Sequence, residues 1–379
     1  MDRFDFLIVG SGLAGAVLAE RIATQLNQKV LIVEKRDHIG GNCYDYRNVD
    51  GILVQKYGPH IFHTSSERVF KYLSRFTDWT NYRHKVVGLY RNKYYPIPIN
   101  LDTVNLFYGL NLENEQELKN FLAQKRVKLA QVKNSRDVVV SRFGEELYEA
   151  FVEQYTKKQW GRYPEELDKS ILERLVCRYD RNPYYFADIY QGMPASGYTK
   201  MFERMLDSRN IQIRLNTDFF KIKRAIKYDR LIYTGPLDQF FSYKFGHLDY
   251  RGIHFAFENI DRESYQPHCV VNHSEMDVEY SRVTEFKKFY DQRSSNTVIC
   301  KEYFGWDGEP CYPVLDLKNH ALLKRYNRKI NFLKNAIFLG RLARFKYLNM
   351  DQVVEESLDA FEAQVSVEFC GPRNLRRYG

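Results

Sequence analysis

Three glycines and a carboxylate near the start of the chain have the spacing of a dinucleotide site. Gly10, Gly12 and Gly15 form a GxGxxG pattern, and Glu34 follows about 20 residues later. In this pattern the first glycine permits a tight turn and the second lets the backbone approach a pyrophosphate. The third lets the next helix, which Leu13 opens, pack closely. The acid can accept ribose hydroxyls and disfavours a 2′-phosphate, so these residues predict a bound dinucleotide with an unmodified ribose.

The segments around these residues have the patterns needed to position them. Asp5–Val9 is apolar enough to form a buried strand, and Lys29–Val33 is a second apolar strand that ends at Glu34. Between the strands, apolar residues recur at helical spacing, namely Leu18, Ile22 and Leu26. The order strand, glycine turn, helix, strand and acid predicts a Rossmann-like unit, which glycines alone would not.

A second pair of glycines favours FAD over NAD. Gly40 and Gly41 closely follow the ribose acid and resemble the second phosphate-binding turn of FAD enzymes of the glutathione-reductase and amine-oxidase group. We expect Lys35, Gly41 and Asn42 to contact the cofactor. The alternative is that the glycine pair serves only a loop.

The composition argues against several classes of protein. The 379 residues suffice for two or three domains. The net charge of +9 comes from basic residues spread along the chain, so we expect anionic ligands and no nucleic-acid partner. Met1 leads directly into the first strand and no apolar run reaches membrane length. We therefore expect a soluble cytoplasmic protein without membrane insertion.

The cysteines and histidines do not have the spacing of metal ligands. The six cysteines include no CxxC pair, which predicts free thiols in a reducing compartment. His60 and His63 are spaced i, i+3, but no third ligand of suitable spacing appears. We expect no metal.

The dinucleotide domain is expected to be discontinuous, because short apolar strands with glycine ends recur at Arg230–Pro236 and Asn335–Arg341. We predict an α/β fold in which residues 1–80, 200–241 and 314–365 form a Rossmann-like FAD-binding domain. Residues at helical spacing predict an inserted helical substrate and lid domain at 101–184. Short β-rich runs predict an inserted antiparallel β-sheet domain made of 81–100, 185–199 and 242–313. Residues 366–379 are expected to form a basic tail.

Several residues in the middle of the chain could bind a substrate or serve only the structure. Phe151 and Tyr155 belong to an aromatic stripe at i, i+4 spacing, which is more often part of a core. Arg174 could lie on a solvated helix face, and Arg282 could be a surface charge on a strand. Composition and spacing leave these alternatives open.

Seven motifs together resemble the prokaryotic UDP-galactopyranose mutase family. They occur in the family's order and with compatible spacing, from the first strand to roughly Val354. The motifs are Gly58–Thr64, Tyr155–Gly161, Tyr185–Asp188, Gly197–Lys200, Tyr233–Gln239, Glu309–Pro313 and Gly340–Ala343.

The resemblance implies a flavin-dependent isomerase that interconverts UDP-galactopyranose and UDP-galactofuranose through a reduced-flavin N5–sugar adduct, without net redox change. It implies that reduced FAD is the active form and that an external reductant supplies its electrons. It also leads us to expect a homodimer.

Carried over to this sequence, the resemblance makes Arg174, Arg282 and His63 the catalytic residues. The two arginines would bind the diphosphate, since guanidinium forks match phosphate oxygens. His63 would lie near the flavin and the reacting carbon, Arg341 near the flavin's phosphates, and Arg174 on a lid within 162–180. The remaining substrate contacts would be Phe151, Tyr155, Trp160, Tyr185, Asn272, Tyr312 and Tyr347.

Some positions depart from the family pattern. Asn349 stands where the family usually has an acid, Cys311 stands where it usually has a second tyrosine, and neither Phe286 nor Lys288 is the histidine expected there. We expect these differences to affect rate and sugar preference rather than reaction class.

Two other functions remain as alternatives. The main rival is an FAD-dependent oxidoreductase of the amine-oxidase or desaturase type acting on a nucleotide-linked substrate, because the fold does not separate it from a mutase. The chain has no second GxGxxG for a nicotinamide nucleotide, which argues against it. The other rival is a non-catalytic flavin- or nucleotide-binding protein.

Overall fold

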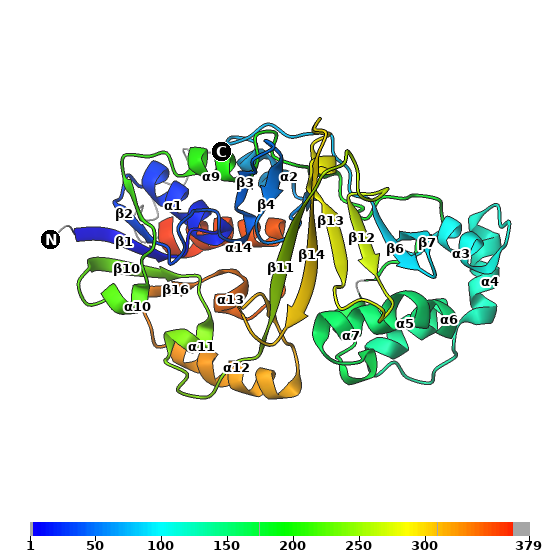
Figure 1. The fold of residues 1–379 in the computed structure, drawn as a ribbon. Coiled ribbons are helices and arrows are strands. Elements are labelled where there is room, and N and C mark those ends of the chain that lie inside the picture. Colours follow the sequence, from blue (N-terminus) through cyan, green and yellow to red (C-terminus); the bar gives the residue numbers. More distant parts are fainter. Residues whose placement is uncertain (1–2, 174, 309, 367–379) are drawn as a thin grey trace.

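The computed structural model describes residues 3–173, 175–308 and 310–366. Three regions follow one another along the molecule: a parallel sheet covered by helices, a large upright sheet, and a group of helices at the far end (Figure 1).

The first region is built on a five-stranded sheet in which all neighbouring strands are parallel. Its order is β16 (Ala336–Phe338), β10 (Lys227–Tyr233), β1 (Arg3–Val9), β2 (Val30–Val33) and β9 (Ile211–Arg214). Strands β10 and β16 lie where the late apolar runs were predicted. The Rossmann-like α/β architecture is therefore present, assembled from segments far apart in the sequence.

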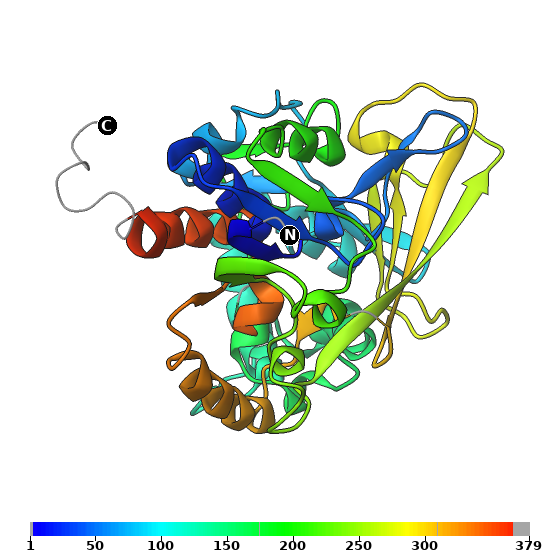
Figure 2. The ribbon, with the colours of Figure 1, turned by 90° about the vertical axis from the view of Figure 1, so that its left-hand side faces the viewer.

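Both faces of this sheet are buried because successive side chains point to opposite faces. Phe6 and Ile8 pack on one side with α1 (Leu13–Gln25), α9 (Tyr198–Met205) and α14 (Met350–Ala360). Leu7 packs on the other side with Tyr326 of α12 (Leu317–Ile330). In both views α1 and α9 lie above the sheet and α12 lies below it (Figure 1, Figure 2).

The second region is a seven-stranded sheet. Its order is β15 (Tyr312–Pro313), β11 (Tyr250–Ile260), β14 (Thr297–Gly305), β13 (Arg282–Glu285), β12 (Val270–His273), β6 (Val86–Tyr90) and β7 (Lys93–Ile97). The sequence predicted an antiparallel sheet, and the neighbouring strands are antiparallel except for β12 and β6, which are parallel. The chain leaves this sheet after β7 and re-enters it only at β11, so β6 and β12 are not joined by a hairpin.

The third region is helical. Helices α3 (Leu101–Tyr108), α4 (Glu115–Lys125) and α5 (Ser135–Phe143) each begin after an asparagine whose side chain accepts a backbone N–H three residues later. Within the segment predicted to be helical, residues 145–160 form α6 (Glu145–Tyr148), a π-helical turn (Glu149–Glu153) and α7 (Gln154–Trp160). Gly161, at φ 69°, ends α7. After α8 (Ser170–Glu173), residues 175–184 form no helix, although their pattern predicted one.

Smaller elements connect these regions. Strand β3 (Asp45–Arg47) pairs with β4 (Leu53–Gln55), and β5 (Phe62–Thr64) pairs with β8 (Tyr190–Gly192) rather than with the large sheet. The short helices are α2 (Glu67–Leu73), α10 (Phe219–Ile222), α11 (Leu237–Phe240) and α13 (Gly340–Arg344). The domain boundaries given above stay a prediction, and residues 367–379 of the expected tail lie outside the described residues. Within the described chain, no helix combines the length and apolarity needed to cross a membrane.

Candidate functional site

The glycine turn leaves an open cradle at the start of α1. Gly10 has φ +99°, and a Cβ there would lie 2.2 Å from Oγ1 of Thr234. A Cβ on Gly15 would lie 2.1 Å from the Gly10 carbonyl oxygen, so the fold itself requires both glycines. A Cβ on Gly12 would meet only the Gly41 Cα, at 3.8 Å. Within the described residues no side chain caps the helix start, so its N–H groups fit an anionic group such as a pyrophosphate.

Glu34 lies at the end of β2, directly beside this turn. Its buried carboxylate accepts the backbone N–H and the hydroxyl of Ser11, both at 2.9 Å, and the N–H of Arg36 at 3.1 Å. The acid therefore fixes the glycine turn on one side. Its position at the strand end is also the one expected of a ribose-binding carboxylate.

The second glycine pair faces the first turn. Gly40 and Gly41 both have positive φ, and a Cβ on Gly41 would lie 2.9 Å from the Gly12 Cα. Asn42 accepts a 3.0 Å hydrogen bond from Arg36, whose guanidinium lies 4.2 Å from the ring centroid of Tyr57. The predicted cofactor residues Gly10, Gly12, Leu13, Gly15, Glu34, Gly41 and Asn42 thus surround one backbone cradle, and Lys35 follows it on the exposed side.

Arg341 lies beside two of the predicted substrate residues. Its guanidinium lies 5.3 Å from the ring centroid of Tyr312 and 5.1 Å from that of Tyr347, and it donates a 2.6 Å hydrogen bond to the Leu348 carbonyl. The two tyrosine rings are stacked on each other at 5.5 Å. This group of one cation and two phenols lies close to α1, because a Cβ on Gly340, which precedes Arg341, would lie 3.4 Å from the Ala14 Cβ.

Arg282, Tyr155 and Asn272 are brought together from one helix and two strands. Arg282 donates to the Tyr155 hydroxyl at 2.8 Å and to Oδ1 of Asn272 at 3.3 Å. Glu302 is buried, with its carboxylate 3.7 Å from Nη1 of Arg282. Burial raises the pKa of Tyr155, although Arg282 opposes this rise. The phenol stays neutral and the guanidinium charged, a donor set suited to phosphate oxygens.

Two predicted aromatic contacts are largely buried. Phe151 lies on the π-helical turn and packs edge-on against Tyr90, Tyr95 and Phe107, so it serves the core whatever else it binds. Trp160 is 3% exposed, and its indole Nε1 has no hydrogen-bond partner among the described residues. A buried N–H without an acceptor is costly, so a ligand oxygen would satisfy it.

His63 is held by groups that the sequence did not indicate. Its Nδ1 lies 2.7 Å from a carboxylate oxygen of Asp188, and its ring stacks on Phe186 at 3.7 Å. Tyr185 contacts Phe186 edge-on and is partly exposed. His84 is buried nearby, and burial, with the charge of Arg282 adding to it, lowers its pKa to about 3.

Asp188, Glu302 and His84 were not predicted as site residues, because no local sequence pattern marks them as such. Asp188 belongs to the Tyr185–Asp188 motif, but nothing in its spacing marks it as the partner of His63, 125 residues away. Glu302 and His84 stand in ordinary strand and loop patterns. Arg174 lies outside the described residues, so its role stays a prediction.

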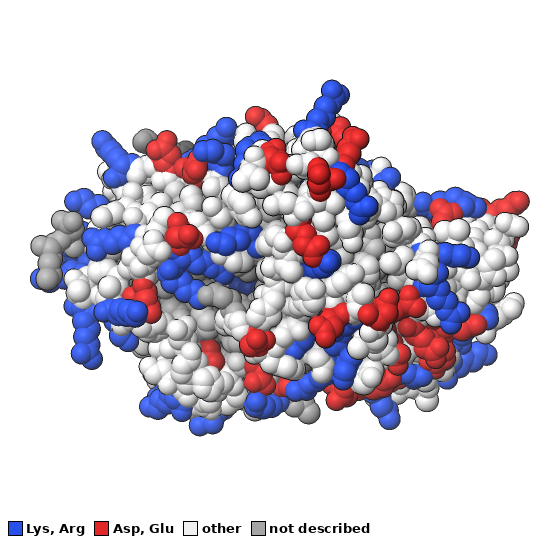
Figure 3. All heavy atoms as spheres, in the orientation of Figure 1, with Lys and Arg blue, Asp and Glu red and all other residues white. Residues whose placement is uncertain are grey.

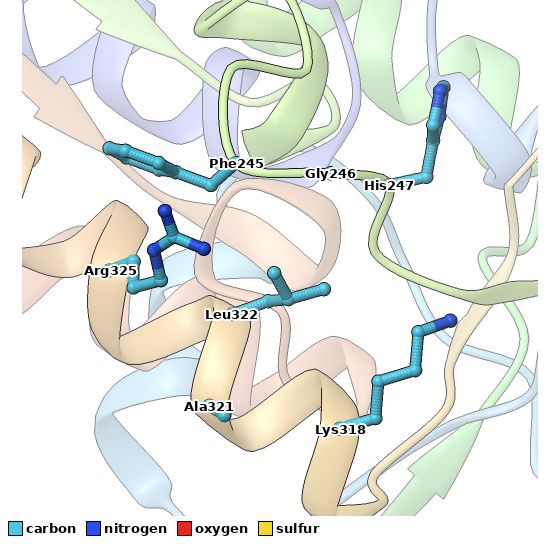
Figure 4. Close-up of a pocket in the computed structure, with 7 residues that line it drawn as sticks. All are labelled: Phe245, Gly246, His247, Lys318, Ala321, Leu322 and Arg325. Atoms are coloured by element: carbon cyan, nitrogen blue, oxygen red, sulfur yellow. The ribbon is translucent and has the colours of Figure 1, made fainter.

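Other features of the surface do not compete with this site. On the face shown in Figure 3, basic and acidic side chains are interspersed. Within the described residues, no group of three or more His, Cys, Asp or Glu is placed to hold a metal ion. A hollow of about 590 Å³ lies between the Phe245–His247 loop and α12 (Figure 4), and none of its lining residues belongs to the candidate site.

Comparisons with known proteins show that the chain is similar to nucleotide-sugar mutases over most of its length. A family model described as UDP-galactopyranose mutase matches residues 150–347, and one described as NAD(P)-binding Rossmann-like domain matches residues 8–76. The chain is 37% identical to "Probable UDP-galactopyranose mutase" of Klebsiella pneumoniae, over 94% of both chains. It is 35% identical to dTDP-fucopyranose mutase of Escherichia coli, over 95% of this chain and 98% of that protein.

A solved structure has the same fold. The crystal structure of a reduced UDP-galactopyranose mutase matches with a TM-score of 0.76 at 14% identity, covering 98% of this chain and 97% of that one. This likeness supports the predicted fold class over nearly the full length.

Proposed function

This chain belongs to the UDP-galactopyranose mutase family, whose members are flavin-dependent sugar isomerases, and from that premise we propose that it interconverts UDP-galactopyranose and UDP-galactofuranose with FAD as its flavin. An external reductant would keep the flavin reduced. The predicted homodimer and cytoplasmic location remain part of the proposal.

One observation supports the nucleotide-sugar assignment above others. Arg282, with its phenol and amide partners Tyr155 and Asn272, is a preassembled donor set for a diphosphate, and Arg341 and Tyr312 lie between it and the dinucleotide cradle. This set of groups favours a nucleotide-linked substrate, which the mutase and the oxidoreductase alternative would share, and the assay described below separates the two.

The chain's own residues would bind and orient the nucleotide sugar. Arg282 would neutralise the diphosphate as negative charge builds on the oxygen that leaves the anomeric carbon. The buried indole N–H of Trp160 would donate to a sugar or phosphate oxygen. If Nδ1 of His63 donates to Asp188, Nε2 is left as the acceptor that can take a proton from a sugar hydroxyl.

The open cradle at Gly12 and the uncapped start of α1 fit the pyrophosphate of FAD, with Glu34 at the ribose. When bound and reduced, the flavin would supply a nucleophilic nitrogen, N5, toward the anomeric carbon, with no net oxidation or reduction.

A second candidate substrate follows from the relatives. The identities to a UDP-galactopyranose mutase and to dTDP-fucopyranose mutase, 37% and 35%, differ little. The departures at Cys311 and Asn349 lie beside the proposed site. Cys311 Sγ is 4.0 Å from Asn42 Nδ2 and directly precedes Tyr312, and Asn349 follows Leu348, whose carbonyl accepts a hydrogen bond from Arg341. A dTDP-linked 6-deoxyhexose is therefore the alternative substrate to test.

The test is an isomerisation assay with both substrates. Dithionite-reduced protein is incubated anaerobically with UDP-galactofuranose or with dTDP-fucofuranose, and the nucleotide sugars are separated by chromatography. We expect UDP-galactopyranose, of unchanged mass, as the product. Conversion of the dTDP sugar alone would reassign the substrate, and a change of mass in either product would favour the oxidoreductase alternative.

A further inference from the structure

Lys158 is a buried cation whose ammonium donates to three backbone carbonyls, one at the end of strand β12 and two in the loop that follows it. Its Nζ donates to the carbonyls of His273 at 3.1 Å and Tyr280 at 3.2 Å, and to that of Glu275. Its side chain is almost fully enclosed, at 8% exposure. The loop joins β12 to β13 and thus separates Asn272 from Arg282.

Lys158 also lies on helix α7, which carries the proposed substrate residues Tyr155 and Trp160. It is three positions after Tyr155 and two before Trp160, in the last turn of α7. From the other side, Arg251 of β11 donates to the carbonyls of Lys158 and Gln159, at 3.2 and 3.1 Å. A cation at this end also suits the helix dipole. The last turn of α7 is therefore fixed both to the β12–β13 loop and to strand β11.

Lys158 is held by hydrogen bonds to backbone carbonyls rather than by an ion pair. Among the described residues, no carboxylate lies within ion-pair distance of its ammonium. Burial lowers the pKa of Lys158 to about 8, and the more distant charges of Asp277 and Glu275 oppose this change. Three carbonyls use all three ammonium donors, which leaves none for a ligand.

We propose that Lys158 is a positioning residue that sets the separation between the β12–β13 pair, with Arg282 and Asn272, and helix α7, with Tyr155 and Trp160. The inference rests on the proposed function, because these four residues are the proposed nucleotide-sugar contacts. Without the ammonium, the loop carbonyls lose their donor and move outward to reach water. Arg282 then shifts relative to Tyr155, and small displacements in such a site are costly.

Lys157 provides a matched control. It is the preceding residue on the same helix and carries the same charge, but its ammonium lies 4.1 Å from the ring centroid of Tyr163. Lys157→Met and Lys158→Met therefore remove equal charge from α7, and only the second removes the contacts to the β12–β13 loop.

The experiment compares these variants as flavin-loaded proteins. In Lys158→Met we expect UDP, titrated by calorimetry, to bind about 10- to 100-fold more weakly and kcat/KM to fall by a similar factor, while flavin content is unchanged. Lys157→Met should stay within about twofold of the wild type. Lys158→Arg, which keeps charge and donors, should restore part of the binding.

Hydrogen exchange of the loop supplies a readout that needs no substrate. Peptides covering residues 273–282 should exchange faster in Lys158→Met than in Lys157→Met, and Lys158→Gln serves if the methionine variant does not fold. Equal exchange in the two methionine variants, or wild-type UDP affinity in Lys158→Met, would overturn the inference. Failure of the wild type itself to bind UDP would instead refute the proposed function, and the exchange result would still decide the role of Lys158.

Discussion

The guanidinium of Arg282 donates a 2.8 Å hydrogen bond to the phenol of Tyr155, and this bond joins strand β13 of the large sheet to helix α7. Although burial opposes the charge, Tyr155 and Glu302 raise the pKa of Arg282 well above its usual value. The arginine is thus a permanent cation whose head group is fixed before any ligand arrives. Preorganisation of this kind reduces the entropy lost on binding.

Arg282→Ala should nearly abolish turnover and weaken UDP binding by roughly 2 to 5 kcal/mol, because it removes charge-assisted hydrogen bonds in an enclosed site. Arg282→Lys should recover little, since a point charge does not reproduce the guanidinium fork. The measurements are steady-state kinetics and UDP titration, with the visible flavin spectrum as a check on folding. Arg3→Ala, at an exposed ion pair with Asp229, is the control. Activity of the Arg282→Ala variant within about twofold of wild type would show that Arg282 does not bind the diphosphate.

Gly12→Val should release the flavin without unfolding the protein. The backbone at Gly12, φ −73°, suits any residue, and a Cβ there meets only the Gly41 Cα at 3.8 Å. We expect the free energy of unfolding of the cofactor-free variant to fall by about 1 kcal/mol or less. Flavin content is measured by absorbance and stability by urea unfolding.

The contrasting variant is Gly15→Ala. Its Cβ would lie 2.1 Å from the Gly10 carbonyl, so it should destabilise the protein by about 1–3 kcal/mol or more, with or without flavin. If Gly12→Val retains full flavin occupancy, the pyrophosphate does not lie at this turn.

Local sequence patterns were sufficient to predict the part of the site whose residues lie close together in the sequence. The GxGxxG turn, its flanking strands and Glu34 occur within 34 residues, and they could be placed from periodicity and glycine spacing alone. Strands β10 and β16 were also predicted, because buried parallel strands are apolar throughout.

Contacts between distant segments left no such signal. The pairing of His63 with Asp188 spans 125 residues, and the contacts of Lys158 with the β12–β13 loop span up to 122. The π-helical turn at Glu149–Glu153 widens one helix without any glycine or proline inside it to mark the change. Family motifs, rather than periodicity, indicated Arg282 and Tyr155, and the geometry then added Glu302 beneath them.

Acid should destabilise the folded protein below pH 6.5, in part through His84. Burial lowers the pKa of His84 to about 3, with the charge of Arg282 adding to the effect, so the unfolded chain binds a proton that the folded one does not. Stability from this group is present above the unfolded pKa of about 6.5 and is lost as the pH falls toward about 3. By pH 5 the loss should be about 2 kcal/mol.

The check is urea unfolding at several pH values with wild type and His84→Gln. The glutamine keeps an acceptor for the Tyr82 hydroxyl, which lies 2.9 Å from Nδ1 of His84, but it does not titrate. The free energy of unfolding of His84→Gln should fall less steeply between pH 6.5 and 5 than that of the wild type. Identical slopes for His84→Gln and wild type would mean that His84 is protonated without cost.

Activity should depend on the oxidation state of the flavin while binding does not. Arg282, Tyr155 and Asn272 owe their arrangement to the protein, so the air-oxidised enzyme should still bind UDP-galactose, yet turn it over negligibly, because oxidised flavin is electron-poor at N5. Reduction with dithionite should switch activity on. Since the proposed isomerisation leaves the flavin reduced at the end of each cycle, one anaerobic reduction should support many turnovers, counted as moles of product per mole of flavin. An oxidase or reductase would need an acceptor or donor for every product molecule. Reductant consumed in proportion to product, or equal rates in both oxidation states, would exclude the mutase mechanism even if UDP-galactose bound tightly.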